Sequence, residues 1–147
     1  MNALKNKQLM QEIFSELSKG NDEPFINAMA EDMKWIWMGS GQWAKTFDGK
    51  KSVLDKLWSA VRQTLVPPYK VNAKHFIADD DYVVVEAIGQ NTTPDGKIYE
   101  NMYCWLCHIK NEKIHELREY MDTDLVTKTF NETNISLTEP SAPFVGS

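Results

Sequence analysis

Two strand-like runs joined by a short polar turn constrain the fold of this chain more than any other feature. They lie within residues 98–126, flank the turn at 110–113 and run into a predicted helix start at Asp122. In the first run, alternate positions from Tyr99 to Ile109 carry aromatic, amide and apolar side chains, and most positions between them are apolar too. Since side chains alternate between the faces of a strand, we expect both faces of this strand to be covered.

The second run places a carboxylate between apolar neighbours. Leu117, Glu119 and Met121 share one face of the predicted strand. A carboxylate in such surroundings is either paired or functional. Because desolvation disfavours the charged form, we expect the pKa of Glu119 to rise toward the range useful to a general acid or base. Two interpretations stay open: Glu119 is catalytic, or it is a structural group held by Tyr103, Asn101 or a helix end.

The rest of the chain shows helical periodicity first and strand-like segments later. The predicted helices are 3–19, 23–30 and 51–64, and the further predicted strands are 32–38, 69–78 and 82–90. The glycine-rich segment 39–49 is predicted to be a loop and is a candidate lid. Asp122 is the predicted N-cap of a final short helix. Helices followed by mostly antiparallel strands form an α+β arrangement.

Composition is that of one globular domain. With 147 residues, 42% of them hydrophobic, the chain can bury a single core. We predict one domain over 1–130 and a flexible tail, or a strap on a partner subunit, over 131–147. The net charge of −5 and the scattered basic residues argue against a nucleic-acid surface. No apolar run approaches the roughly 20 residues of a membrane helix and no signal-peptide core is visible, so we expect a cytoplasmic protein without membrane contact.

Metal and cofactor chemistry have no support in the sequence. Cys104 and Cys107 have CxxC spacing, but residues three apart in a strand face opposite sides, so these thiols cannot pair or share a metal. The three histidines lie on separate segments without a carboxylate spacing that links them. Neither a phosphate-binding glycine pattern nor a nucleophile elbow occurs. We therefore expect no metal and no cofactor.

The spacing of aromatic and polar residues after position 95 resembles the SnoaL-like family of the NTF2-like superfamily. The matching positions are Asp95, Gly96, Tyr99, Asn101, Tyr103, Trp105, Lys113, Ile114, Arg118, Glu119, Tyr120, Asp122 and Thr123. A weaker likeness extends back to about residue 5. The resemblance implies a cone, in which a strongly bent, mostly antiparallel sheet wraps around N-terminal and central helices and encloses a concave pocket.

The resemblance also implies a homodimer formed through the convex face of the sheet. In this chain, that face would carry mostly apolar side chains. They are Val84, Glu86, Ile88, Met102, Cys104 and Leu106. Such a surface is apolar enough to favour a partner subunit.

Strand alternation and the resemblance together place one carboxylate among aromatic side chains in the pocket. The predicted catalytic residues are Glu119 and Tyr103, and the predicted ligand-binding residues are Trp35, Trp37, Asn101, Trp105, Leu117 and Met121. The catalytic groups of the ketosteroid isomerases fall near Trp37, Ile13 and Trp105, none of which can replace them. The limonene-epoxide hydrolase set also lacks two of its three members.

What remains is a pocket with a single carboxylate, closest to that of the polyketide cyclases. One hypothesis is an isomerase-like or cyclase-like enzyme, or a hydrolase-like one, that uses acid/base chemistry without metal on a hydrophobic substrate, cyclic substrates included. The alternative is a module without catalysis, either a binder of small ligands or a structural homodimer whose own side chains fill the cavity. The sequence predicts a pocket and leaves enzyme and binder as open alternatives.

Overall fold

A computed structural model describes residues 2–130, which form helices around one large sheet and a small second sheet. The helical elements are α1 (Asn2–Leu17), α2 (Glu23–Ala28), α3 (Lys50–Ser52), the π-helical η1 (Val53–Trp58), α4 (Ser59–Thr64) and α5 (Thr123–Phe130). The strands are β1 (Met29–Trp37), β2 (Lys45–Asp48), β3 (Val71–Asp79), β4 (Tyr82–Gly89), β5 (Asn91–Thr92), β6 (Ile98–Tyr99), β7 (Met102–Lys110) and β8 (Lys113–Met121). The predicted α+β class is confirmed.

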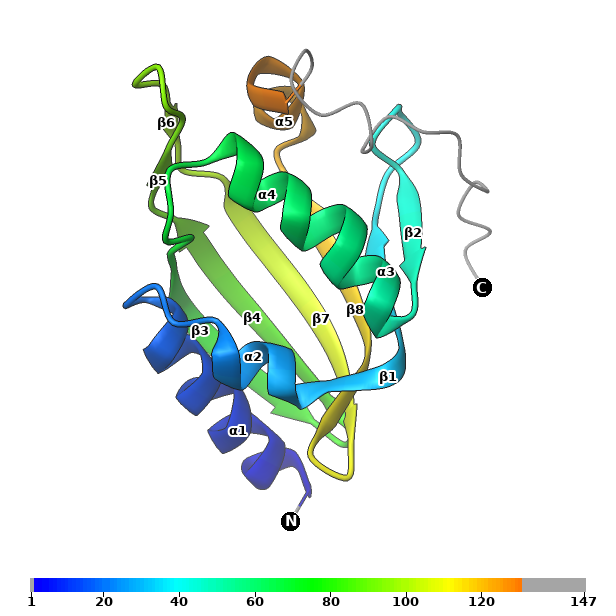
Figure 1. Ribbon diagram of the computed structural model, residues 1–147. Coiled ribbons are helices and arrows are strands. Elements are labelled where there is room, and N and C mark those ends of the chain that lie inside the picture. The colour runs from blue at the N-terminus through cyan, green and yellow to red at the C-terminus, as the bar shows by residue number, and fades with distance from the viewer. Residues whose placement is uncertain (1, 131–147) are drawn as a thin grey trace.

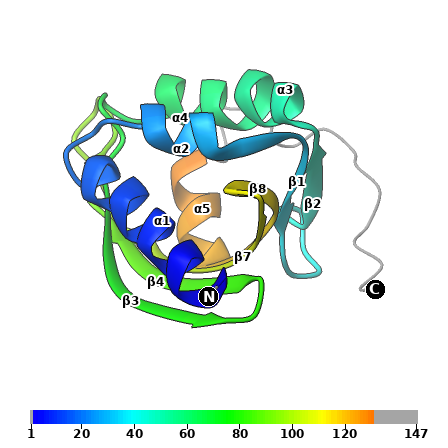
Figure 2. The same ribbon diagram turned by 90° about the horizontal axis from the view of Figure 1, so that it is seen from below.

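The large sheet has the strand order β2-β1-β8-β7-β4-β3. Every neighbouring pair is antiparallel except β1 and β8, which run parallel. The sheet bends around its contents, and α1, α2 and the helical segment α3–α4 lie over its concave side (Figure 1). Seen along the bend, sheet and helices form a ring, and α5 lies across one end of it (Figure 2). The core therefore sits inside a cone that α5 closes.

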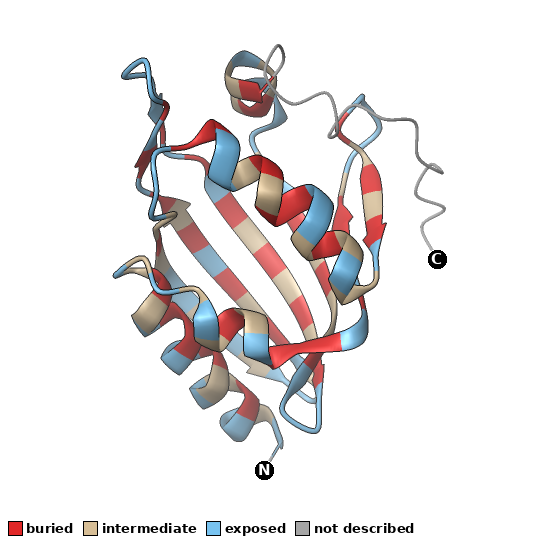
Figure 3. Cartoon of the chain, in the orientation of Figure 1, coloured by how far each residue is buried: buried red, intermediate tan, exposed pale blue. Residues whose placement is uncertain are grey.

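The alternation predicted for the long hairpin is visible in its burial. Tyr103, Trp105, Cys107 and Ile109 on β7 are buried, whereas Met102 is 67% exposed. Buried bands consequently alternate with less buried ones along the central strands (Figure 3). Because the inner positions pack against helices, a register slip of one residue would expose the whole apolar set.

Helix α1 contributes the facing layer of the core. Its buried apolar residues are Met10, Ile13, Phe14 and Leu17, which recur at steps of three and four and so lie on one stripe. Phe14 packs against the ring of Trp105 at 5.4 Å between centroids. Burial of such side chains contributes on the order of 1.5–3 kcal/mol each before conformational entropy is subtracted.

Two predicted elements differ from the structure. The segment 39–49 is not all loop, because Lys45–Asp48 forms β2 and pairs antiparallel with β1. Glycines earlier in the segment obscured this short strand. The first hairpin run is also not one strand, since Ile98–Tyr99 belongs to β6 and pairs with β5, and β7 begins only at Met102.

Asn101 gives the physical reason for that break. Its side-chain Nδ2 donates to the carbonyl oxygen of Asp122 at 3.1 Å, and its Oδ1 accepts from the Asp122 backbone N–H at 3.0 Å. This amide thus replaces a backbone pair at the end of the β7–β8 ladder. Asp122 then caps α5 as predicted, since its Oδ1 accepts from the N–H groups of Asp124 and Leu125.

Two further expectations concern the chain ends and membranes. The predicted tail, 131–147, lies outside the described residues. Among residues 2–130, no helix has both the length and the apolar character to cross a membrane.

Candidate active site

Glu119 lies in the middle of β8, inside the cone. In the register of the sheet it stands opposite Trp37 on β1 and opposite Trp105 on β7. Trp35 lies two residues before Trp37 and therefore on the same face of β1. Glu119 is 4% exposed. The two flanking strands thus direct three indoles toward one buried carboxylate. The burial of Glu119 agrees with the alternation of Leu117, Glu119 and Met121 in the sequence.

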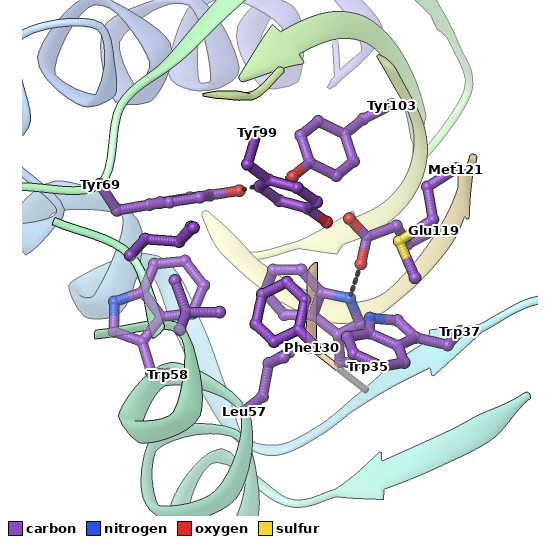
Figure 4. Close-up of a pocket in the computed structure, with 12 residues that line it drawn as sticks. Trp35, Trp37, Leu57, Trp58, Tyr69, Tyr99, Tyr103, Glu119, Met121 and Phe130 are labelled. Atoms are coloured by element: carbon purple, nitrogen blue, oxygen red, sulfur yellow. Dashed lines mark hydrogen bonds between the residues drawn. The ribbon is translucent and has the colours of Figure 1, made fainter. Parts of the chain in front are cut away.

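Each oxygen of the carboxylate accepts one indole hydrogen bond. Trp35 Nε1 donates to Glu119 Oε1 at 2.9 Å, and Trp105 Nε1 donates to Oε2 at 2.9 Å. The bond from Trp35 is drawn in Figure 4. An indole can only donate, so both contacts favour the charged carboxylate over the neutral acid.

Burial acts in the opposite direction and is the larger effect. Desolvation raises the pKa of Glu119 from 4.5 to about 7, and the hydrogen bonds from Trp105 and Trp35, with the indole of Trp37 nearby, limit the rise. The carboxyl group consequently exists in both protonation states near neutral pH. This is the condition under which one group can both remove and return a proton.

The third indole differs from the other two. Trp37 is 5% exposed and faces the carboxylate, yet among the described residues its Nε1–H meets no hydrogen-bond acceptor. It lies in the wall of a cavity and beside Glu119 (Figure 4). A buried donor without a partner is rare in a folded protein.

Tyrosine hydroxyls line the other side of the carboxylate. Tyr69 donates to the hydroxyl oxygen of Tyr103 at 3.3 Å, and Asn101 Nδ2 donates to the hydroxyl oxygen of Tyr99 at 3.1 Å. Burial raises the pKa of all three phenols well above its ordinary value, and the charge of Glu119 raises it further. These hydroxyls are therefore neutral at physiological pH, and those of Tyr99 and Tyr103, which accept in these bonds, keep their hydrogens for donation.

The cavity beside Glu119 is small and mostly apolar. It is lined by Trp35, Trp37, Leu57, Trp58, Val61, Leu65, Tyr69, Tyr99, Tyr103, Glu119, Met121 and Phe130. Its volume is about 30 Å³, enough for one or two water molecules. Phe130, the last residue of α5, packs on Tyr99 with 5.3 Å between ring centroids. The aromatic side chains thus fill most of the interior in this conformation.

The structure brings most of the predicted site residues together. Glu119, Tyr103, Trp35, Trp37 and Met121 all lie in the cavity wall. The other three predicted residues lie behind it: Trp105 hydrogen-bonds Glu119, Asn101 holds Tyr99 and the end of β8, and Leu117 is in the core. Their predicted contact with a ligand, like that of the wall residues, stays a prediction.

Sequence reasoning missed several members of the wall. They are Tyr69, Tyr99, Phe130 and the residues of the η1–α4 face, including Trp58. The inner stripe of that helical segment predicts that Leu57, Trp58 and Val61 are buried, but not what they face. Tyr69 follows Pro67–Pro68, and no local signal there indicates a cavity.

The glycine-rich segment proposed as a lid contacts the closing helix. Trp43 Nε1 donates to Thr127 Oγ1 on α5 at 2.7 Å, and Gln42 Nε2 donates to the same oxygen at 3.4 Å. The lid hypothesis is not tested by this contact. The two hydrogen bonds link the glycine-rich segment to α5 and not directly to Glu119.

Comparison with known proteins identifies the family. The SnoaL-like domain model matches residues 10–117, which is most of the chain. The chain belongs to the SnoaL-like family. No protein of curated function matches the sequence.

Solved structures place this SnoaL-like chain among NTF2-like folds. An NTF2-like protein from Burkholderia xenovorans has a TM-score of 0.66 at 21% identity, over 89% of this chain and 99% of its own. A presumed SnoaL-like polyketide cyclase from Jannaschia has a TM-score of 0.70 at 15% identity, over 89% of this chain and 94% of its own. A presumed isomerase from Bacillus subtilis has a TM-score of 0.70 at 16% identity, over 91% of this chain and 99% of its own. At these identities the likeness establishes the fold, and the predicted NTF2-like architecture is confirmed.

Proposed function

We propose that this SnoaL-like domain is a proton-transfer enzyme of the isomerase or cyclase type, with Glu119 as its acid/base group and a hydrophobic molecule as its substrate. The observation that carries the proposal is the state of Glu119. It is buried, its pKa is raised to about 7 by burial, and the cavity wall, as far as residues 2–130 form it, contains no lysine, arginine or histidine to neutralise it. Buried charges are normally paired with an opposite charge, whereas Glu119 has only indole hydrogen bonds in that place.

The chemistry follows from one carboxylate in an apolar wall. Charged Glu119 removes a proton from a carbon next to a carbonyl group, and the electron pair of that C–H bond moves onto the carbonyl oxygen. If the substrate is a β,γ-unsaturated carbonyl compound, the product of this step is a dienolate. Glu119 then returns the proton to the γ carbon, the C=O bond re-forms, and the C=C bond moves into conjugation, which is an isomerisation. In a cyclisation, the enolate carbon instead attacks a second carbonyl of the same molecule, and the new alkoxide takes the proton.

Tyr103 supports this reaction as a neutral donor. Its raised pKa keeps the phenol protonated, and its hydroxyl already accepts from Tyr69. A phenol in such a chain can donate to a substrate oxygen on which negative charge develops. Tyr103 is therefore the second catalytic residue of the proposal, and Trp35, Trp37 and Met121 shape the apolar contacts.

Substrate entry requires the cone to open, because drug-sized ligands occupy cavities of roughly 300–1,000 Å³ and this cavity has about 30 Å³. The end closed by α5 is the favoured entrance. Helix α5 is the last element of the described chain, and Phe130 on it covers the wall at Tyr99. Displacement of Phe130 would enlarge the space beside Glu119.

The proposal is tested by exchange of carbon-bound hydrogen. Incubation of the protein with 2-tetralone, a ketone with acidic hydrogens, in deuterated buffer should speed the incorporation of deuterium followed by NMR. We expect Glu119→Gln to lower the rate by roughly 100-fold or more, since general acid/base groups contribute about 10²–10⁴-fold. Asp22→Asn, which alters a carboxylate outside the cavity, serves as the control and should leave the rate unchanged.

The alternative function is binding without turnover, and the nearly filled cavity is the observation that favours it. A binder would shift tryptophan fluorescence on adding 2-tetralone and would show no exchange above that of buffer. Exchange that persists in Glu119→Gln would instead show that another group carries the proton. A circular-dichroism spectrum of each variant confirms that it is folded.

We also propose a cytoplasmic homodimer that forms through the outer face of the sheet. The large exposed apolar residues on this face are Ile77, Tyr82, Met102 and Tyr120. They lie on adjacent strands and share the outward side by register. Sedimentation of the wild type and of Met102→Asp tests the proposal, which predicts a dimer that the substitution weakens.

A further inference from the structure

The indole N–H of Trp37 is a buried donor that nothing in the described residues satisfies. The cost of leaving such a group unpaired approaches that of a lost hydrogen bond. The neighbouring indoles are satisfied, because the N–H groups of Trp35 and Trp105 both donate to the Glu119 carboxylate. Trp37 stands directly opposite Glu119 in the sheet, and its indole lies beside the same carboxylate in the cavity wall (Figure 4). A donor left free at this point can serve an acceptor that comes from outside the chain.

We propose that the Trp37 N–H binds a carbonyl oxygen of the substrate and so orients the neighbouring carbon toward Glu119. This inference rests on the proposed function and deepens it, because it assigns the substrate class and a residue that selects it. The substrate is an uncharged, enolisable ketone or a related carbonyl compound with an apolar body.

The chemistry of the wall narrows the ligand to this class. The N–H can only donate, so the ligand must supply an acceptor. An anionic acceptor would meet the negative charge of Glu119, and the wall contains no cationic side chain to offset that repulsion. A carbonyl oxygen is uncharged, has two lone pairs and brings no hydrogen of its own toward the donor.

Position also favours a role in the reaction. As proton removal proceeds, negative charge develops on the carbonyl oxygen, and a fixed donor at that oxygen stabilises it. Because Trp37 and Glu119 are cross-strand neighbours, donor and base are held on one rigid face of the sheet. A carbonyl oxygen at the indole therefore leaves the adjacent carbon near the carboxylate.

Trp58 provides a matched control. It lies in the same cavity wall, but its Nε1–H is used, since it donates to Asp22 Oδ2 at 2.6 Å. Trp37→Phe and Trp58→Phe each replace an indole of the wall with a phenyl ring. Only the first removes a donor that is free to meet a ligand.

The experiment measures affinity for three probes by titration of the wild type and both variants. The probes are 2-tetralone, the alcohol 2-tetralol and the hydrocarbon tetralin, which share one carbon skeleton. We expect the wild type to bind the ketone more tightly than the hydrocarbon by roughly three- to tenfold, the range of one net hydrogen bond. Trp37→Phe should lose this preference and Trp58→Phe should keep it.

A second measurement needs no variant to fold. In a ¹⁵N–¹H correlation spectrum of the wild type, the Trp37 indole resonance should shift with 2-tetralone and not with tetralin. The inference is overturned if that resonance does not respond to the ketone, if Trp37→Phe keeps the preference, or if the alcohol binds more tightly than the ketone. The proposed function fails separately, when Glu119→Gln retains deuterium exchange although the Trp37 resonance still shifts.

Discussion

Among residues 2–130, two carboxylates accept an indole N–H, and they lie in different electrostatic settings. Asp22 accepts from Trp58 at 2.6 Å and also from the guanidinium of Arg62 at 2.7 Å. Its side chain is 24% exposed. Glu119 accepts from Trp35 and Trp105 at 2.9 Å each and is enclosed without a cation in the cavity wall.

The difference separates a structural carboxylate from a chemically responsive one. At Asp22, a guanidinium and nearby solvent face the carboxylate, and the group ties the start of α2 to η1 and α4. At Glu119, indole dipoles offset only part of the desolvation, and the pKa is raised to about 7. Both carboxylates accept an indole N–H, but Asp22 also has a cation and partial access to solvent, and Glu119 has neither.

The largest expected consequence is a dependence of stability on pH that comes from Glu119. In the folded state its pKa is about 7, against an ordinary value of 4.5, so the folded protein binds a proton that the unfolded chain does not hold between these pH values. The free energy of unfolding should therefore decrease as pH rises from about 4.5 to about 7, by about 3 kcal/mol, and then level off. Urea unfolding at a series of pH values measures this.

Glu119→Gln is the control, because it removes the titrating group and should flatten this part of the profile. Asp22→Asn should leave the decrease in place. If the wild type and Glu119→Gln have parallel profiles between about pH 4.5 and 7, the carboxylate is not desolvated as the structure indicates. The contrast with Asp22 would then disappear.

The second expectation concerns the donor-only nature of the two indoles. In Glu119→Gln, the amide oxygen can accept from one indole, but the amide NH₂ then faces the other N–H, a mismatch of about 1–3 kcal/mol. Trp105→Phe removes one of the donors and should relieve that mismatch. The two substitutions are therefore expected to be less destabilising together than the sum of their separate effects, by about 1–2 kcal/mol.

A double-mutant cycle above pH 7 isolates this coupling from the effect of removing the charge. Trp58→Phe combined with Glu119→Gln is the matched pair, since Trp58 bonds Asp22 and not Glu119. We expect that pair to be additive. If the effects of Glu119→Gln and Trp105→Phe are additive as well, the Trp105 indole does not bind the Glu119 carboxylate in solution.

Local patterns in the sequence predicted much of this site. The alternation of Leu117, Glu119 and Met121 predicts an inward carboxylate, and the same period places Trp35 and Trp37 on one face of their strand. Strand pairing is not a local property. The parallel pairing of β1 with β8 joins Trp37 to Glu119 across more than 80 residues, and no pattern in either segment specifies that register.

The missed features share a related cause. Tyr99 and Tyr103 alternate correctly, but the chain leaves the sheet between them, because Asn101 bonds the backbone of Asp122. Aromatic residues on both sides conceal that break in a periodicity analysis. Phe130 was missed because its contact with Tyr99 depends on where α5 docks after its cap at Asp122. Tertiary contacts decide such positions, and they are not encoded by spacing alone.

The smallest expected effect lies at the structural carboxylate. Arg62→Met removes the cation from Asp22, but the Arg62 side chain is 57% exposed, so solvent already weakens the ion pair. We expect a loss of about 0.2–1 kcal/mol in the free energy of unfolding, less in high salt, and no change in deuterium exchange. Thermal unfolding at low and high salt measures it. A loss well above this range, insensitive to salt, would place Asp22 in the same class as Glu119, and the cation together with solvent access would no longer explain why the two carboxylates differ.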